Sequence, residues 1–415
     1  MRESKTLEFK SRISNTFLKT ISAFANYGGG SVIFGVNDDG TVCGLNNPEQ
    51  ACLDIENKIN DTIHPQPTYA LSVQPNERTV TLSVEPGISP PYLYKGKAYR
   101  RNDLATIEVD ALELTRLILK GRHMHFEQLP ANRQDLTFNV LQMAAVREIG
   151  IAEINQDILK TLNLYSDTEG YNHAAELLAD VNGFPGIDIA RFGESISIIL
   201  KREMIENRSI LTELDETVKI FRDFYRYEAI QGMERKVIER IPEEAFRETI
   251  ANALIHRTWD VDAQIRVMMY DDRIEVTSPG GLPSGISEEE YLNGSVSVLR
   301  NPIIGNVFYR LHIVEILGTG VLRIKEAYRG SDKKPAFEIF ENSIKVTLPI
   351  VDRQDLTDDE LMVLGVLSQN LPKSIGEITD ALPFGRSKTT KLLKDLASKH
   401  YVTISGRGRG TKYSK

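Results

Sequence analysis

The stretch EAFRETIANALIHRTW, which begins at Glu244, carries polar side chains at four-residue intervals. They are the carboxylate of Glu248, the amide of Asn252 and the imidazole of His256, groups that can hold a ligand or exchange a proton. On an α-helix this spacing puts all three on one face, because four residues advance just over one turn. The alternative is an amphipathic helix whose solvated face happens to carry these side chains.

The elements that would position this stripe lie in residues 236–352. A helix opens the segment, and its apolar positions lie largely off the polar stripe, where they can pack on a sheet. Strands are predicted at AQIRVMMY and RIEVTS, followed by a glycine-bearing loop SPGGLP, a second helix after LGTGV and a closing strand SIKVTLPI. This order predicts a two-layer α/β sandwich.

The motif E-x-x-x-N-A at Glu248, together with SPGGLP and LGTGVLRI, resembles the GHKL-like ATPase fold shared by histidine kinases, gyrase and heat-shock chaperones. NAL-I-HR and SPGGLP are typical of a divergent, RecG C-terminal-like subfamily found in transcriptional regulators. The resemblance implies that ATP binds with Mg²⁺, that Asn252 carries the metal and that Glu248 is the base that activates a water molecule. These roles suit Mg²⁺, which prefers oxygen ligands and keeps several waters.

The same resemblance assigns the glycine loops to the nucleotide. Glycine lets backbone approach a ligand, and the helix after Gly320 would offer free N–H groups to phosphate. The implied nucleotide-binding residues are Ser278, Gly280, Gly281, Gly318, Thr319 and Gly320. Ser278 stands where other members of the fold place an adenine-reading aspartate, so we expect ATP binding more than hydrolysis. No GxxxxGK[ST] loop occurs in the chain, so a helicase motor is not expected.

Residues 1–122 are predicted to form an α+β domain. Strands are expected at TLEFK, GSVIFGV, YALSVQP, RTVTLSVEP and KAYRRN, with helices at 14–26 and 49–63. Glu3, Glu8 and one of Asp38 or Asp39 could converge at one end of the sheet and hold a divalent metal that activates water at a phosphodiester. The alternative is an edge strand with solvated charges and a tight turn.

Several linked motifs of this segment resemble the Schlafen AlbA-type domain. They are E-S-x-x-L-E-F-K at Glu3, FAN-x-x-GG-x-x-x-x-GV-x-D-x-G at Phe24 and Y-x-R at Tyr99. The resemblance implies nucleic-acid binding and, in some members, RNA cleavage at three carboxylates, for which Glu3, Glu8 and Asp38 are the candidates with Mg²⁺ or Mn²⁺. The cations expected to contact phosphate are Lys10, Arg100 and Arg101.

The last segment, residues 353–415, is rich in basic side chains. Two capping-box signatures, Thr357 to Glu360 and Ser374 to Glu377, each open a short helix with an apolar period. A basic helix over GRSKTTKLLKDLASKHY, then a strand, a glycine-bearing tip and a strand, resembles a winged helix. The residues expected to contact DNA are Arg386, Lys388, Thr389, Thr390, Lys391, Arg407, Arg409 and Lys412. The alternatives are a flexible basic tail and a winged helix that binds protein.

The whole chain of 415 residues is predicted to be an α/β and α+β multidomain protein, with a mostly helical connecting domain at residues 123–235. Two cysteines and no long apolar run predict a cytoplasmic protein outside membranes. The net charge of -8 means that any surface for nucleic acid must be local. We expect a homo-oligomer.

Three functions remain open. The first is a transcriptional regulator that binds ATP and nucleic acid, DNA more than RNA. The second is a metal-dependent nuclease, gated by ATP, with its site on the N-terminal domain. The third is a dimerisation scaffold without a ligand. We rank them in this order, because the pairing of Glu248 with Asn252 argues against a scaffold.

Overall fold

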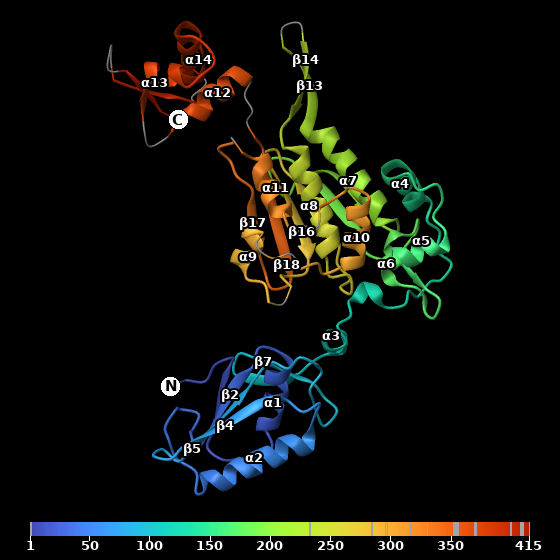
Figure 1. Cartoon of the computed structure of the whole chain (residues 1–415), viewed down its shortest axis with the longest axis vertical. Helices are drawn as coiled ribbons and strands as arrows, with labels where there is room; N and C mark the ends of the chain where they lie inside the picture. Colours follow the sequence, from blue (N-terminus) through green and yellow to red (C-terminus); the bar gives the residue numbers. More distant parts are fainter. Residues whose placement is uncertain are drawn as a thin grey trace. The chain divides into compact units, whose positions relative to one another are not determined.

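The computed structural model describes residues 2–414 except 232–233, 284, 295, 297, 316–317, 330, 352–356, 369–371, 399–400 and 407–410. The protein is a mixed α/β chain with several sheets (Figure 1). It divides into two compact units. Unit 1 comprises Met1–Asp135 with Gln156–Glu176, and unit 2 comprises Leu136–Asn155 with Leu177–Lys415. Among the described residues, no helix is long and apolar enough to cross a membrane.

Unit 1 is built around a small sheet. Its elements are β1 (Leu7–Lys10), α1 (Phe17–Asn26), β2 (Gly30–Phe34), α2 (Pro48–Thr62), β3 (Ile63–His64), β4 (Tyr69–Gln74), β5 (Thr79–Val84), β6 (Leu93–Tyr94), β7 (Tyr99–Asn102), β8 (Ala105–Glu108), α3 (Ala111–Gly121), α5 (Gln156–Thr161), β9 (Tyr165–Ser166) and β10 (Gly170–Tyr171). The main sheet has the order β1-β2-β5-β4, in which only β1 and β2 run parallel. The five strands predicted in this segment correspond to β1, β2, β4, β5 and β7 and are confirmed.

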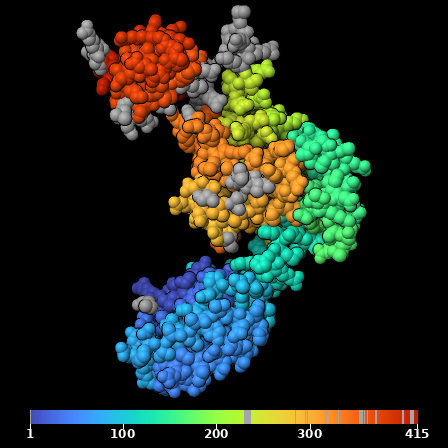
Figure 2. All heavy atoms as spheres, in the orientation of Figure 1, coloured from blue at the N-terminus to red at the C-terminus, as the bar shows by residue number. Residues whose placement is uncertain are grey.

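The core of unit 1 forms between this sheet and the first two helices. Every residue of α1 except Lys19 is buried, because the helix carries apolar or small side chains nearly all round. Phe17 of α1 meets Phe34 of β2 edge to face, with ring centroids 5.1 Å apart. Ala51, Ile55 and Ile59 recur every four residues along α2 and present one buried stripe to the same core. The blue part of Figure 2 shows these elements packed into one compact body.

Unit 2 contains the helix of interest and a larger sheet. Its elements up to residue 351 are α4 (Asn139–Ile149), β11 (Ile187–Phe192), β12 (Ile199–Ile205), α7 (Ile210–Tyr225), β13 (Arg226–Gln231), β14 (Glu234–Glu239), α8 (Glu243–His256), β15 (Ile265–Met269), β16 (Arg273–Pro279), α9 (Glu288–Asn293), α10 (Pro302–Arg310), α11 (Gly320–Ala327), β17 (Ala336–Ile339) and β18 (Ser343–Pro349), while α6 (His173–Leu178) crosses from unit 1. The helices and strands predicted over 236–352 correspond to α8, β15, β16, α11 and β18 and are confirmed.

The large sheet has the strand order β12-β11-β15-β16-β18-β17. Along β15, Ile265, Val267 and Met269 are buried while Arg266 between them is exposed, the alternation expected of a sheet covered on one face. On the apolar face, α7 packs against β11 and β12, and α8 packs against β16 and β18. Ile250 and Leu254 of α8 are fully buried there, so the apolar positions predicted to pack on a sheet do so.

The sheet extends further back along the chain than we predicted. β11 pairs in parallel with β15 and antiparallel with β12, so the first two strands come from the segment that we assigned to the connecting domain. The cause is chemical: Ile187 and Ile189 are buried apolar side chains that need the cover of α7. The division at 122, 235 and 352 stays a prediction, and the boundary at 235 separates strands that share one sheet.

The described residues of the C-terminal part of unit 2 form three helices and a small sheet. Its elements are α12 (Asp358–Val366), β19 (Lys373–Ser374), α13 (Ile375–Asp380), α14 (Arg386–Ser398), β20 (Thr403–Ser405) and β21 (Lys412–Ser414), with the strand order β19-β21-β20. Both predicted capping boxes are present, Thr357 with Glu360 and Ser374 with Glu377. Leu393 of α14 is fully buried in the shared core, so this segment is folded.

Candidate functional site

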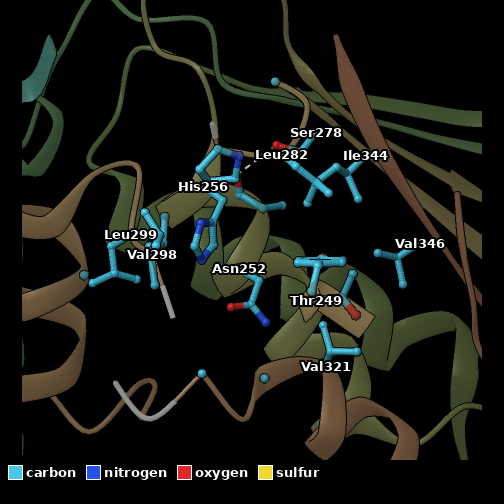
Figure 3. Close-up of a pocket in the computed structure, with 18 of the residues that line it drawn as sticks. Thr249, Asn252, His256, Ser278, Leu282, Val298, Leu299, Val321, Ile344 and Val346 are labelled. Atoms are coloured by element: carbon cyan, nitrogen blue, oxygen red, sulfur yellow. Dashed lines mark hydrogen bonds between the residues drawn. The ribbon is translucent and has the colours of Figure 1, made fainter. Parts of the chain in front are cut away.

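A pocket lies beside α8, between that helix, the strands β16 and β18 and helix α11 (Figure 3). Thr249, Asn252 and His256 line it from α8, and Ser278 lines it from the end of β16. The remaining wall is largely apolar and includes Leu282, Val298, Leu299, Val321, Ile344 and Val346. Two members of the polar stripe, Asn252 and His256, therefore face a largely apolar pocket.

Most of the residues predicted to hold a nucleotide meet at this pocket. Those that line it are Asn252, Ser278, Gly280, Gly281, Gly318 and Gly320. Glu248 and Thr319 are adjacent to lining residues without lining the pocket themselves. These residues come from three segments of the chain, namely α8, the end of β16 with the loop after it, and the start of α11.

Gly320, the first residue of α11, lies against the Glu248–Asn252 pair. Asn252 Nδ2 donates a hydrogen bond of 3.1 Å to Glu248 Oε1, one turn earlier on α8. A Cβ atom at Gly320 would lie 2.5 Å from Asn252 Nδ2 and 2.6 Å from Glu248 Oε1, closer than real Cβ contacts. Glycine therefore lets the start of α11 approach this pair without displacing either side chain. Thr319, the N-cap of α11, makes no side-chain capping bond, so the first N–H groups keep donor capacity.

Burial sets the protonation of the stripe. Glu248 is 8% exposed. Burial raises the pKa of its carboxyl, while the hydrogen bond from Asn252 and the charge of Arg323 oppose the rise. Burial, reinforced by the charge of Arg300, lowers the pKa of His256 to about 4, so this imidazole is neutral at pH 7. The stripe therefore offers a carboxylate, an amide and a neutral imidazole.

Ser278 is tied to the same helix. Its hydroxyl donates a hydrogen bond of 2.9 Å to the carbonyl oxygen of Ala253 on α8, which leaves the Oγ lone pairs as acceptors. Two residues later, Gly280 has a φ of +112°, and a Cβ there would lie 2.2 Å from Thr258 Oγ1. The chain can make this turn beside the pocket only with glycine.

The donors at the pocket fit a Mg²⁺ ion that shares its ligands with a bound phosphate. Asn252 offers Oδ1, because Nδ2 is engaged with Glu248. Mg²⁺ is commonly held by one or two protein oxygens together with waters and substrate phosphates. Within the described ranges, no group of three or more His, Cys, Asp and Glu side chains could hold a metal alone. A cation here would depend on the phosphates that it accompanies.

The carboxylates predicted to hold a metal near the N-terminus do not form a cluster of three. Glu8 is buried and accepts a hydrogen bond of 2.6 Å from Thr20 as well as contacts from two cations. Glu3 accepts a hydrogen bond of 2.8 Å from the backbone N–H of Phe9, and Asp38 is exposed. Among the described residues these carboxylates do not meet in one group, and protein groups contact both oxygens of Glu8 and one oxygen of Glu3, so the three-carboxylate metal site stays a prediction.

The cations predicted beside them are also engaged. Arg101 Nη1 lies 2.5 Å from Glu8 Oε2, and its side chain is only 4% exposed. Lys10 Nζ lies 2.6 Å from Glu8 Oε1, and Arg100 Nε lies 3.4 Å from a Glu113 carboxylate oxygen. Arg101 therefore cannot present its charge to phosphate as predicted, since it is the internal partner of a buried carboxylate.

Two segments of the chain match known protein families. Residues 3–110 match the family described as "Schlafen, AlbA_2", and residues 262–348 match the family described as "Putative ATP-dependent DNA helicase recG C-terminal". The chain contains an AlbA_2 domain and a RecG C-terminal-like domain. The second match begins after α8, so Glu248 and Asn252 precede the matched residues of the RecG C-terminal-like domain. No curated protein sequence matches the chain.

Two solved structures show the extent of the similarity. The crystal structure of the DIP2311 protein from Corynebacterium diphtheriae is 20% identical, with a TM-score of 0.50, over 99% of this chain and 92% of that chain. This likeness concerns the fold alone. The solution structure of the N-terminal domain of a RecG-related protein from Nitrosomonas europaea is 20% identical over 25% of this chain and 78% of that chain. Its TM-score of 0.19 is too low to support an argument.

The residues predicted to contact DNA lie outside both matched domains, and they differ in how exposed their side chains are. Arg386, Lys388 and Lys391 of α14 and Lys412 of β21 are exposed, and Thr390 is half-buried. Thr389 is fully buried, so the prediction that it faces outward is wrong: the apolar period of α14 turns it toward the core with Leu393. Lys388 Nζ lies 2.5 Å from an Asp359 carboxylate oxygen. Arg407 and Arg409 lie outside the described residues.

The AlbA_2 domain has a basic pocket that the sequence did not reveal. Lys19, Lys95 and Lys97 line it together with Asn15, Thr16, Tyr94 and Tyr99. Lys97 is paired with Glu108 at 2.7 Å, whereas Lys19 and Lys95 lie over tyrosine rings at 5.6 and 5.5 Å from the ring centroids. The turn YKGK holds two of these lysines, but Lys19 joins them only through the fold.

Proposed function

We propose that this chain is an ATP-binding transcriptional regulator that also binds nucleic acid, DNA in the first place. The observation that carries the ATP part is the contact of Gly320 with the Glu248–Asn252 pair at the wall of the pocket. This contact brings the N-terminus of a helix against a carboxylate and an amide, an arrangement suited to phosphate with a divalent cation. The family match over residues 262–348 supports the same ligand.

Each residue has a proposed part in holding the nucleotide. The first turn of α11 donates N–H groups to the phosphates, and Asn252 Oδ1 holds Mg²⁺. Bound Mg²⁺ supplies charge compensation for the phosphate oxygens. The apolar wall with Ile344 and Val346 takes the adenine ring, and Ser278 Oγ accepts a hydrogen bond from its amino group. Glu248 is the proposed base toward water, and its raised pKa suits a proton acceptor.

Two variants of the full chain separate these roles. Asn252→Ala is expected to remove the difference between ATP binding in Mg²⁺ and in EDTA, because the metal loses its protein ligand. Glu248→Gln is expected to keep Mg²⁺-dependent binding, since the amide still accepts from Asn252, and to lose any hydrolysis. Asn306→Ala, an amide change on α10 at a residue that does not line the pocket, serves as the control. Wild-type Mg²⁺-dependent affinity in Asn252→Ala would exclude this metal site.

For DNA, we propose that α12 to α14 with the sheet β19-β21-β20 form a winged helix whose α14 contacts the duplex. The exposed Arg386 and Lys391 support this, since cations on one helix can neutralise phosphates. Lys391→Ala in the full chain should weaken duplex binding on all sequences and reduce the log-log salt slope by about one unit. Lys219→Ala on α7 is the matched control. An unchanged slope for Lys391→Ala would assign DNA binding elsewhere.

For the AlbA_2 domain, we propose that Lys19 and Lys95 contact nucleic-acid phosphate in place of Lys10 and Arg101. Both lysines are exposed at one open pocket, whereas Arg101 is buried with Glu8. The double variant Lys19→Gln, Lys95→Gln should weaken binding of single-stranded RNA or DNA and leave the fold intact. Lys5→Gln, an exposed lysine of the same domain outside this pocket, is the control. Equal affinity of the double variant and the control would remove this surface from the proposal.

A further inference from the structure

β12 is the edge strand at one end of the six-stranded sheet. An edge strand leaves a row of backbone N–H and C=O groups without sheet partners. The chain around β12 is also apolar at its surface, with side chains at least 48% exposed at Ile196, Ile198, Ile199, Leu200 and Met204. Single exposed apolar residues are ordinary, but three of these lie on β12 itself and two in the turn that precedes it, and together they indicate an interface.

We propose that β12 pairs antiparallel with β12 of a second copy of this chain. The pairing joins two six-stranded sheets into one continuous sheet related by a two-fold axis perpendicular to it. Such an interface uses the same surface on both copies, so the strand must be complementary to itself. Within the sequence ILKREMI of β12, opposite charges face each other at one register.

The register follows from the faces of the sheet. A two-fold axis perpendicular to the sheet keeps the helical layers of both copies on the same side of the joined sheet. Two residues that face each other across the interface must therefore have side chains on the same face of the sheet. Neighbouring residues of a strand point to opposite faces, so the axis must pass through a residue and not between two residues. With the axis at Arg202, Lys201 of each copy faces Glu203 of the other, so these two residues, which lie 2.6 Å apart within one chain, also meet as opposite charges across the interface. With the axis at Lys201 or at Glu203, like charges meet at the axis and no opposite charges of the strand face each other, which is unfavourable.

The remaining pairs of this register are compatible. Leu200 faces Met204 on the open side of the sheet, and both side chains are half exposed in the single chain. The two Arg202 side chains meet at the axis, but each is already paired with Asp188 through two hydrogen bonds of 2.9 Å. Each guanidinium therefore brings its own counter-charge to the axis.

The opposite edge of the sheet lacks these properties. β17 spans only four residues, Ala336–Ile339, against the seven residues of β12. Very short edge strands are one of the usual means of preventing edge-to-edge association. The two ends of one sheet thus differ, and β12 is the end that can accept a partner strand.

Charge reversal tests the register in the full chain. Lys201→Glu and Glu203→Lys each place like charges opposite each other twice in the dimer, so each variant alone should dissociate at about tenfold higher concentration than wild type. An equimolar mixture of the two variants restores opposite charges at both positions. We expect sedimentation velocity to show a dimer for wild type, a shift to monomer for each variant and recovery of the dimer in the mixture.

The mixture also controls for misfolding of the variants. If either variant were misfolded, mixing it with the other would not restore the dimer. Glu338→Lys on β17 is the control and should leave the wild-type distribution unchanged. A monomeric wild type, or single variants that stay dimeric, would overturn the proposal. Failure of the mixture to recover the dimer would overturn the register at Arg202 and with it the pairing argued above.

Discussion

Replacing Gly320 by alanine separates the stability of the fold from the binding of nucleotide. The new Cβ would lie 2.5 Å from Asn252 Nδ2 and 2.6 Å from Glu248 Oε1, so both side chains must move away from their observed positions. Both contacted atoms are the ends of flexible side chains, and Gly320 lies within helix α11. The backbone therefore tolerates alanine, while the proposed metal ligand does not keep its place.

Two effects of Gly320→Ala on the stability of the fold have similar sizes and opposite signs. Alanine in place of a glycine in the middle of a helix stabilises by roughly 0.5–1 kcal/mol, and at the first position of α11 the gain is at most this. Loss of the hydrogen bond between Asn252 and Glu248 costs about 1 kcal/mol. The free energy of unfolding should therefore change by less than about 1 kcal/mol, while displacement of a metal ligand costs roughly 10–100-fold in Mg²⁺-dependent affinity for ATP.

The assay combines thermal unfolding with titration of ATP in Mg²⁺ on the full chain. Gly365→Ala in α12 is the matched control, because a Cβ there meets nothing within 4 Å. It should raise stability slightly and leave ATP binding unchanged. Wild-type affinity of Gly320→Ala for Mg²⁺-ATP would refute the role assigned to this contact, and global unfolding of the variant would refute the claim that the backbone tolerates alanine.

Two further predictions concern buried carboxylates. Glu8→Gln leaves the Arg101 guanidinium buried without its counter-charge and should cost about 3–5 kcal/mol in urea denaturation, against little change for the exposed Glu77→Gln. Burial raises the pKa of Glu213 from 4.5 to about 8, so the folded chain binds a proton there that the unfolded chain releases. The stabilisation from this proton is present at low pH and is lost as pH rises toward about 8. Glu213→Gln should remove this decrease of the free energy of unfolding with rising pH. If wild type and variant showed the same pH dependence of that free energy, the raised pKa of Glu213 would be contradicted.

Local patterns in the sequence predicted the local structure well. The alternation in RIEVTS and SIKVTLPI predicted β16 and β18 because a sheet with one covered face requires it. Thr357 and Ser374 marked two helix starts, since a capping box satisfies backbone groups within a few residues. The stripe of Glu248 and Asn252 was visible for the same reason, because both residues lie on one turn of one helix.

What the sequence could not reveal depends on residues far apart in the chain. Arg101 was expected to meet phosphate, but the fold places it against Glu8, which lies 93 positions earlier. Ile187 and Ile189 of β11 gave no sign that their partner would be β15, because parallel pairing leaves no short-range signal. The same limit applied to Thr389, which looked exposed until its helix was seen against the core.

The most direct test of the account is isothermal titration calorimetry of the full wild-type chain with ATP, in Mg²⁺ and again in EDTA. The account predicts saturable binding of ATP in Mg²⁺ and clearly weaker binding in EDTA, because Asn252 and α11 hold the phosphates together with the cation. Absence of binding at millimolar ATP with Mg²⁺, or equal binding in both buffers, would contradict it.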